Sequence, residues 1–211
     1  RDLRVLDPAC GSGHFLLYSF DLILTIYEEA WAAHESGPCS QATGRRLHDD
    51  YPDLTSLRTA TPALILEHNL HGVDIDPRAV GCARRNGVPA VVGDLVAPIR
   101  DAPRFDLITA VAPYVPTAAI ALLPADVQRH EPRLALDGGI EGTELVGRIV
   151  SAAARLLHPG GHLLVEIGGE QQDALVDPLT AAGFGEAAPW VDEDGDLRGL
   201  VAMWRSPNLT P

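Results

Sequence analysis

One stretch decides the fold of this chain: Asp7-Pro8-Ala9-Cys10-Gly11-Ser12-Gly13-His14-Phe15. It joins a short apolar run at residues 3–7, typical of a buried strand, to a dense apolar segment at residues 14–33, which predicts a largely buried helix. The two glycines allow tight backbone turns and close approach to a ligand. The helix start would present free N–H groups to a carboxylate. The stretch therefore predicts a strand–loop–helix unit that binds a small ligand carrying a carboxylate.

Outward from this unit, strand and helix patterns alternate, which favours a parallel sheet covered by helices on both faces. The further strands are predicted at residues 70–74, 90–92, 105–111 and 163–167, and the helices at 62–68, 77–86, 142–157 and 171–182. Asp194-Gly195 predicts the turn of a C-terminal hairpin with its return strand at residues 200–204. We therefore expect an α/β fold, a doubly wound seven-stranded mixed sheet with an antiparallel C-terminal hairpin.

A polar segment with Pro and Gly, at about residues 34–61, predicts an exposed insertion. Residues 1–211 are otherwise expected to form a single domain, because 46% hydrophobic and 21% charged content suits one globular core. No apolar run approaches the roughly 20 residues that span a bilayer. Three widely separated cysteines, Cys10, Cys39 and Cys82, match no disulfide framework or metal site. We expect a cytoplasmic protein that needs no metal.

The net charge of −13 bears on possible partners. All 16 basic residues are Arg, against 29 acidic residues. A DNA-binding surface gains affinity by neutralising phosphates, so this balance weighs against an autonomous nucleic-acid binder, although it leaves room for a local basic patch.

Acidic residues follow three of the predicted strands. Asp7 could accept a hydrogen bond from an amino group, and Asp74 could hold two ribose hydroxyls. Asp94 could accept from an adenine amine. S-adenosylmethionine carries all three groups as well as a carboxylate, so the pattern predicts a site for it. Taken alone, Asp74 or Asp94 is equally typical of a helix cap, and Asp76 before Pro77 is more typical of a cap than of a ligand.

These motifs resemble those of class I S-adenosylmethionine-dependent methyltransferases. Residues 78–204 are similar to the HemK/PrmC family of protein N5-glutamine methyltransferases, through Ala79-Val80-Gly81-Cys82-Ala83-Arg84-Arg85-Asn86, Ala112-Pro113-Tyr114-Val115-Pro116-Thr117, Glu131-Pro132-Arg133-Leu134-Ala135-Leu136-Asp137-Gly138-Gly139, Glu166-Ile167-Gly168 and Gln171. Residues 5–80 are similar instead to N6-adenine DNA methyltransferases, through Asp7–Phe15, Ile26-Tyr27-Glu28-Glu29-Ala30-Trp31 and the run from Glu67 to Ala79.

The resemblance implies roles for particular residues. The cofactor would be bound by Asp7, Ala9, Gly11, Gly13, Asp74, Ile75, Asp94 and Leu95. The catalytic tetrapeptide would be Val111-Ala112-Pro113-Tyr114, in which Val111 replaces an Asn or Asp that accepts a hydrogen bond from the target nitrogen. The Ala112 carbonyl would supply a second acceptor, and Tyr114 would pack against the planar target. Glu131 would contact the substrate amide, with Asp137-Gly138-Gly139 shaping the pocket.

Three functions follow as expectations. The first is methyl transfer to a protein glutamine amide, for instance in a peptide chain release factor. The second is N6-adenine DNA methylation. The third is a cofactor-binding module whose activity is lost or altered because of Val111. The N-terminal helical recognition region of the glutamine family and the target-recognition regions of the DNA enzymes are both absent from this sequence, and the abrupt start at Arg1-Asp2-Leu3-Arg4 suggests a missing N-terminal segment.

Overall fold

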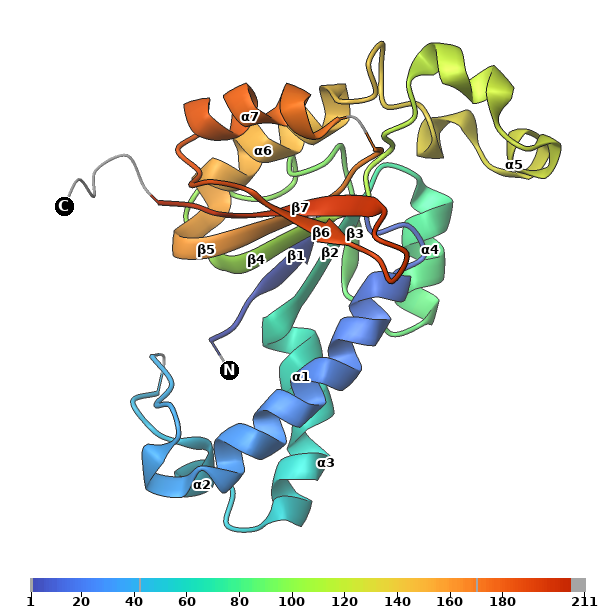
Figure 1. The fold of residues 1–211 in the computed structure, drawn as a ribbon. Coiled ribbons are helices and arrows are strands. Elements are labelled where there is room, and N and C mark those ends of the chain that lie inside the picture. Colours follow the sequence, from blue (N-terminus) through green and yellow to red (C-terminus); the bar gives the residue numbers. More distant parts are fainter. Residues whose placement is uncertain (1, 42, 170, 206–211) are drawn as a thin grey trace. The chain divides into compact units, whose positions relative to one another are not determined.

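The computed structural model of the chain describes residues 2–41, 43–169 and 171–205 (Figure 1). Its strands form a seven-stranded mixed sheet with the order β3-β2-β1-β4-β5-β7-β6. The predicted fold class, a seven-stranded α/β sheet with an antiparallel C-terminal hairpin, is confirmed. The chain divides into two compact units, Arg1–Asp94 and Leu95–Pro211, and each is described in turn.

The first unit is built on three parallel strands, β1 (Val5–Asp7), β2 (Leu70–Asp74) and β3 (Ala90–Val92). The last two match the predicted strands, whereas β1 begins two residues later than expected. Leu6 and Val73 are fully buried, as expected for parallel strands covered on both faces.

The long helix α1 (His14–Ala32) corrects one expectation. Its apolar density predicted a largely buried helix, and Leu16, Ile23 and Tyr27 are indeed buried. Tyr18, Leu22 and Ile26 instead lie on the surface, with exposed fractions of 67%, 52% and 47%. These three follow an i, i+4, i+8 spacing, so they share one face of the helix. The dense pattern misled because neighbouring elements cover only the opposite side.

Three helices follow α1 within the polar segment 34–61: the short η1 (His34–Ser36), α2 (Leu47–Asp50) and the first part of α3 (Leu54–Leu64). Helices α2 and α3 pack against α1, and Leu57 of α3 is fully buried. The predicted helix at 62–68 therefore starts eight residues too late. Asp53 caps α3 by accepting from the Ser56 N–H, and Pro62 lies near its end, before a π-helical turn at Ile65–Asn69.

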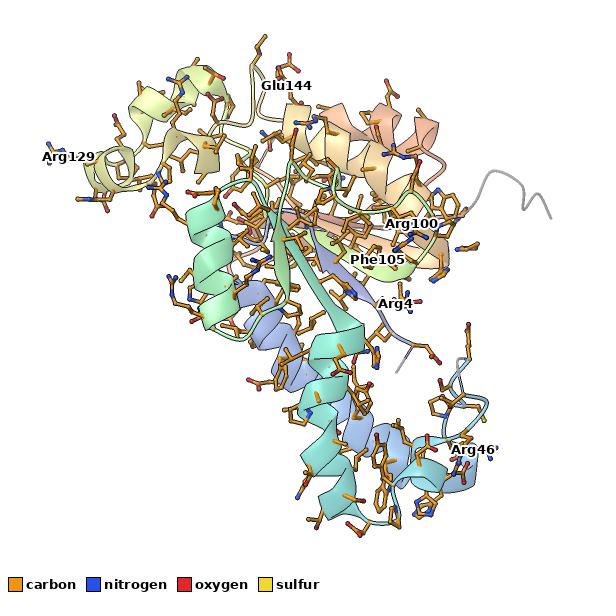
Figure 2. The ribbon with its side chains drawn as sticks, turned by 180° about the vertical axis from the view of Figure 1, so that it is seen from behind. Arg4, Arg46, Arg100, Phe105, Arg129 and Glu144 are labelled. Atoms are coloured by element: carbon orange, nitrogen blue, oxygen red, sulfur yellow. The ribbon has the colours of Figure 1, made fainter. Side chains whose placement is uncertain are left out.

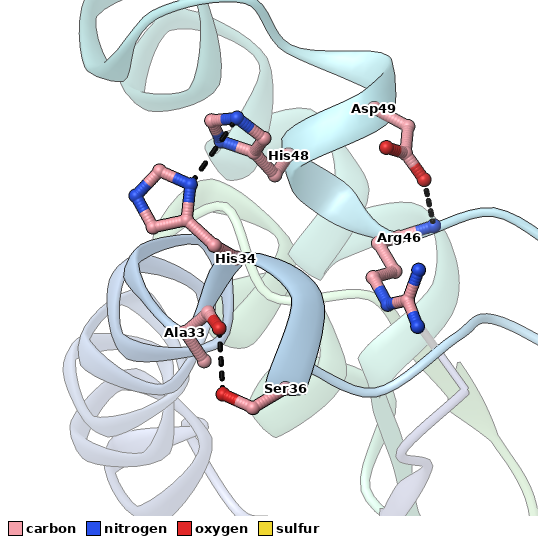
Figure 3. A pocket seen from close by; sticks show the side chains of 6 residues that line it. All are labelled: Ala33, His34, Ser36, Arg46, His48 and Asp49. Atoms are coloured by element: carbon pink, nitrogen blue, oxygen red, sulfur yellow. Dashed lines mark hydrogen bonds between the residues drawn. The ribbon is translucent and has the colours of Figure 1, made fainter.

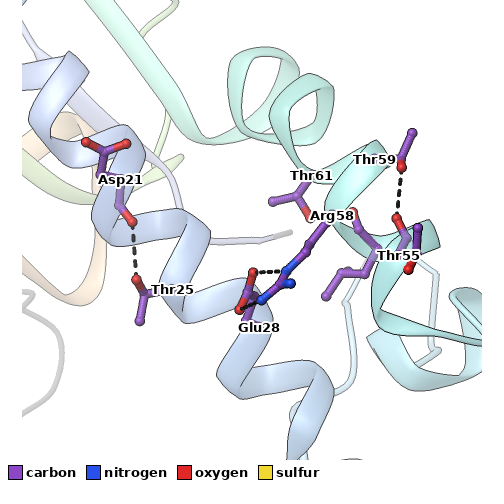
Figure 4. Close-up of polar contacts among 8 residues, drawn as sticks. Asp21, Thr25, Glu28, Thr55, Arg58, Thr59 and Thr61 are labelled. Atoms are coloured by element: carbon purple, nitrogen blue, oxygen red, sulfur yellow. Dashed lines mark hydrogen bonds and ion pairs between the residues drawn. The ribbon is translucent and has the colours of Figure 1, made fainter.

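Polar contacts stabilise the packing of α2 and α3 against α1, an arrangement called here the helical hairpin. Arg58 of α3 donates two hydrogen bonds to the Glu28 carboxylate on α1, at 2.6 and 2.9 Å (Figure 4). At the far end of α1, His34 Nδ1 and His48 Nε2 lie 3.2 Å apart beside a hollow of about 600 Å³ (Figure 3). Trp31 donates its indole N–H to the Tyr51 carbonyl at 2.8 Å. The hairpin thus has its own contacts besides its apolar core.

The second unit pairs β4 (Phe105–Ala110) in parallel with β5 (Leu157–Glu166), and β5 in turn with the antiparallel hairpin β7 (Leu197–Met203) and β6 (Ala188–Val191). The strand β5 starts six residues before the predicted 163, because Pro159, Gly160 and Gly161 lie in an irregular first part of the strand. Gly160 donates to the Trp204 carbonyl and Trp204 to the Gly161 carbonyl, which keeps this stretch paired.

Helices α6 (Glu144–Leu156) and α7 (Gln172–Ala181) accompany these strands, close to their predicted bounds. Phe105 lies inside this unit and is 1% exposed (Figure 2).

Between β4 and α6 lie three short helices without buried residues: η3 (Thr117–Leu122), α5 (Ala125–His130) and η4 (Arg133–Ala135). The remaining helix α4 (Pro77–Arg85) belongs to the first unit. Among the described residues, no helix combines the length and apolar character needed to cross a membrane.

Gly72 in the middle of β2 generates a stability prediction. A Cβ at this position would lie 2.9 Å from the Cys10 sulfur and 3.0 Å from Leu16 Cδ1. We expect Gly72→Ala to destabilise the protein by about 1–3 kcal/mol through overpacking, measured by urea denaturation. Gly81→Ala on α4 is the matched control, since its Cβ would meet an atom only at 3.6 Å. That variant should be at least as stable as the parent, and equal stability of the two variants would contradict the packing argument.

Candidate functional site

The loop between β1 and α1 folds back on the neighbouring strand. Cys10 donates its N–H to the Val73 carbonyl at 2.9 Å, and Gly13 donates to the Cys10 carbonyl at 2.8 Å. Gly13 has a φ of +86° and sits so close to Val88 that a Cβ would lie 3.0 Å from its Cγ2. Only glycine fits this position without strain. Glycine is therefore required at position 13 because the loop packs closely on Val88.

Asp74, at the end of β2, joins two loops. Its Oδ2 accepts the Gly11 N–H at 2.8 Å, and its Oδ1 accepts the Asp76 N–H at 2.8 Å. The backbone carbonyl of Asp74 also accepts from Gly93 at 2.9 Å. Each carboxylate oxygen can accept a further hydrogen bond. Asp74 can therefore accept hydrogen bonds from hydroxyl groups while it keeps both backbone partners.

Asp7, at the end of β1, is 3% exposed, and its Oδ1 accepts the Ala9 N–H at 3.0 Å. Burial raises the pKa of Asp7 to about 7, and the charge of Asp74 adds to the rise. Burial and the charges of both carboxylates raise the pKa of the Cys10 thiol to about 12. Cys10 is thus held as a neutral thiol, which agrees with a packing role and not with that of a nucleophile.

Helix α1 opens on Gly13 without any side-chain cap. The N–H groups of its first turn are those that an α-helix leaves without intrahelical partners. They can serve an anionic group, as the sequence predicted. Helix α4 contrasts with it, because Asp76 caps the helix by accepting from the Arg78 N–H at 2.8 Å. The prediction that Asp76 is a cap is confirmed.

The remaining sequence-predicted cofactor residues lie at the same strand ends. Ile75 follows β2 and is 49% exposed, and Asp94 is exposed two residues after β3. Leu95 comes next in the chain and has an unusual φ of +48°. The carboxyl ends of parallel strands are where open α/β sheets bind ligands. The first unit therefore gathers Asp7, Ala9, Gly11, Gly13, Asp74, Ile75 and Asp94 at its strand ends and connecting loops, and their individual roles stay predictions.

In the second unit, the predicted catalytic tetrapeptide leaves β4 at its carboxyl end. Val111 is 51% exposed, whereas Ala112 is buried. The Tyr114 hydroxyl donates to Glu166 Oε1 at 3.0 Å. Partial burial raises the pKa of the Tyr114 phenol, and the Glu166 charge raises it further. Tyr114 thus stays a neutral donor whose ring is fixed at its far end.

Glu166 is a residue whose role the sequence reasoning missed. The family resemblance includes Glu166 but implies no role for it. It ends β5, the strand that pairs in parallel with β4. An acidic residue at the end of a strand next to the tetrapeptide is the signal that would have predicted this contact.

The segment that follows Tyr114 is braced by the Gly-rich segment 136–142. Val115 donates to the Leu136 carbonyl at 3.0 Å, and Gly138 donates to the Val115 carbonyl at 2.9 Å. Asp137 accepts from the Thr117 hydroxyl at 2.6 Å and pairs with Arg133 at 3.0 Å. These contacts hold the Gly-rich segment against the residues that follow Tyr114. That residues 137–139 shape a substrate pocket stays a prediction.

A hollow of about 450 Å³ opens beside the same segment and is lined by Tyr114, Pro116, Thr143, Gly168 and Ala174 among others. Glu131 is exposed at the end of α5, where its N–H donates to the Val127 carbonyl. It does not line this hollow. Its predicted contact with a substrate amide stays a prediction.

The raised pKa of Asp7 generates a prediction about stability and pH. The folded protein holds a proton on Asp7 that the unfolded chain releases near pH 4, so this residue costs stability as pH rises from about 4 to 7. Asp7→Asn keeps an acceptor for Ala9 and removes the charge. We expect the ligand-free variant to match the parent near pH 4 and to exceed it by up to roughly 4 kcal/mol at pH 8, measured by denaturation across pH. A difference that is constant with pH would overturn the assignment.

The release factor glutamine methyltransferase of Moorella thermoacetica is 42% identical over 134 residues, which covers 57% of this chain and 47% of that protein. The same enzyme of Bradyrhizobium diazoefficiens is 34% identical over 175 residues, 76% of this chain and 57% of the relative. A ribosomal protein uL3 glutamine methyltransferase of Burkholderia pseudomallei is 47% identical over 85 residues, 37% of this chain and 27% of the relative. No family model matches the chain.

Among solved structures, a ribosomal protein L11 methylase from Lactobacillus delbrueckii subsp. bulgaricus superposes with a TM-score of 0.51 at 15% identity, over 97% of this chain and 71% of that one. This likeness concerns the fold alone. The chain spans about half the length of the curated relatives it matches. These findings support the similarity to glutamine methyltransferases, and the resemblance of residues 5–80 to DNA methyltransferases is not shown. The chain is therefore a homologue of the HemK/PrmC glutamine methyltransferases and has the class I methyltransferase fold.

Proposed function

We propose that this chain transfers a methyl group from S-adenosylmethionine to the side-chain amide of a glutamine in a protein. The observation that carries the proposal is the 42% identity with a release factor glutamine methyltransferase. The tetrapeptide that ends in Tyr114 follows the carboxyl end of β4 and has its tyrosine hydroxyl held by Glu166, which supports the proposal. DNA methylation is not favoured, and the net charge of −13 also weighs against it.

The residues of the first unit suit the proposed cofactor. The uncapped first turn of α1 would hold its carboxylate, and Asp7 would accept from its amino group. Asp74 would accept from the ribose hydroxyls, and Asp94 from the adenine amine. When bound, S-adenosylmethionine supplies an electrophilic methyl group on a sulfonium. A cation next to Asp7 would also favour the charged form of this carboxyl group.

The residues of the second unit suit a planar amide. The Ala112 carbonyl would accept one amide hydrogen, and the ring of Tyr114, held by Glu166, would pack against the amide plane. Such positioning would fix the orientation of the amide nitrogen for transfer. Transfer forms the N–C bond, breaks the S–C bond and releases one amide proton, so the products are the methylated protein and S-adenosylhomocysteine.

Val111 favours a second candidate function. Its side chain has no acceptor for the second amide hydrogen. A missing acceptor costs on the order of 1–3 kcal/mol, or about tenfold to a hundredfold in rate. A cofactor-binding module with lost or altered activity is therefore the second candidate.

Protein substrates come first among the possible acceptors, because the relatives' names specify release factors and ribosomal protein uL3.

Cofactor binding can be tested by titration calorimetry. The parent chain is expected to bind S-adenosylmethionine, and Asp74→Ala should weaken binding at least tenfold, because it removes the proposed ribose acceptor and the anchor of Gly11. Asp21→Ala, the same change at an exposed position of α1, is the control and should leave affinity unchanged. A folded parent chain that does not bind S-adenosylmethionine would contradict the proposed methyltransferase function.

Methyl transfer can be tested with tritiated S-adenosylmethionine on release factor, uL3 and duplex DNA. Val111→Asn restores a side-chain acceptor, so we expect it to raise transfer to a protein substrate about tenfold to a hundredfold. Val176→Asn is the matched control, because Val176 lies on α7 with a similar exposed fraction of 53%. A gain on DNA alone would reverse the substrate assignment. No gain on any substrate would favour the binding module.

A further inference from the structure

The side-chain amide of Gln171 ties together three separate segments of the second unit. Its Nε2 donates to the Tyr114 carbonyl at 2.8 Å and to the Glu141 carbonyl at 3.1 Å. Its Oε1 accepts the Gly168 N–H at 2.8 Å. Both ends of one amide are thus engaged, and the side chain is only partly exposed. The family resemblance includes Gln171 but implies no role for it.

The three segments meet too closely for ordinary side chains. A Cβ at Gly142 would collide with the Tyr114 carbonyl oxygen and with Gln171 Nε2, and Gly142 has a φ of +74°. A Cβ at Gly138 would lie 2.7 Å from the Pro113 carbonyl oxygen and from Tyr114 Cα. The Gly-rich segment therefore presses directly against the backbone of the tetrapeptide.

Gln171 is itself fixed by the turn between β5 and α7. Its N–H donates to the Gly168 carbonyl at 3.1 Å, one residue before α7 begins at Gln172. Tyr114 consequently has two anchors on this part of the unit. Glu166 at the end of β5 holds its hydroxyl, and Gln171 holds its carbonyl. With both groups held, the ring of Tyr114 and the peptide that follows it have little freedom to rotate.

We propose that Gln171 is a positioning residue for methyl transfer, which sets the backbone of residues 112–114 through the Tyr114 carbonyl. This inference rests on the proposed function. The requirement is for two donors and one acceptor in a single planar group, which an amide supplies and a carboxylate does not. Gln171→Glu keeps the size and the acceptor for Gly168, removes both donors and turns a negative charge towards two carbonyl oxygens.

The test compares Gln171→Glu with Gln172→Glu in the 211-residue chain. The control makes the same chemical change one position later, at the first residue of α7. Two readouts are taken: amide hydrogen exchange of Val115 and Thr117, whose N–H groups bond Leu136 and Gly139, and steady-state methyl transfer to a release factor. We expect at least tenfold faster exchange and at least tenfold lower kcat in Gln171→Glu, with the KM for S-adenosylmethionine and the melting temperature close to those of the control.

The outcomes separate this inference from the function beneath it. Exchange rates and a kcat equal to those of the control would show that the Gln171 hydrogen bonds do not hold the segment around Tyr114 in place. Faster exchange with an unchanged kcat would overturn the positioning role, and a parallel loss of melting temperature, KM and kcat would reduce Gln171 to a structural residue. If the parent and its Val111→Asn variant both transfer no methyl group, the proposed function fails, and with it the positioning role. Equal exchange rates in Gln171→Glu and the control would separately refute the claim that Gln171 holds the segment around Tyr114.

Discussion

The carboxylate of Asp74 is the contact on which the first unit's ligand-binding edge depends. It accepts one N–H from the glycine loop after β1 and another from the turn that begins α4. A loop as rich in glycine as residues 8–13 loses much conformational freedom when it becomes ordered. Hydrogen bonds to a charged acceptor contribute about 1.5–3 kcal/mol each, so one aspartate offsets a substantial part of that cost. The loop is thereby shaped before any ligand arrives.

The second unit solves the same problem with one carboxylate and one neutral amide. Its loops also leave the carboxyl ends of parallel strands, and side chains from the next strand end hold them. Glu166 accepts a hydrogen bond from the Tyr114 hydroxyl, and the Gln171 amide donates to the Tyr114 carbonyl and to the Glu141 carbonyl within the Gly-rich segment. Glycines at 138 and 142 are required there because a larger residue would push the two segments apart. In both units, a polar side chain one strand away fixes a loop that its own residues could not fix.

Sequence reasoning succeeded where the cause is local. The strands at 70–74 and 90–92 and the Asp76 cap depend on residues within a few positions of one another. The glycine loop could be predicted from its own residues, although Val88 and Asp74 hold it in the folded chain. It failed where the cause is tertiary. The exposed face of Tyr18, Leu22 and Ile26 depends on which neighbours α1 has, and β5 begins early because Trp204 pairs with the Gly160–Gly161 irregularity. Glu166 and Gln171 were visible as family marks, but their contacts span 52 and 57 residues of chain.

The proton that Asp7 retains near neutral pH has a thermodynamic consequence. With a pKa of about 7, this carboxyl group is only partly ionised under ordinary assay conditions. A positively charged ligand group placed beside it favours the ionised form, so association releases a fraction of a proton to the solvent. The heat of association then includes the ionisation enthalpy of the buffer, and titrations in phosphate and in Tris would give different apparent enthalpies for the same event.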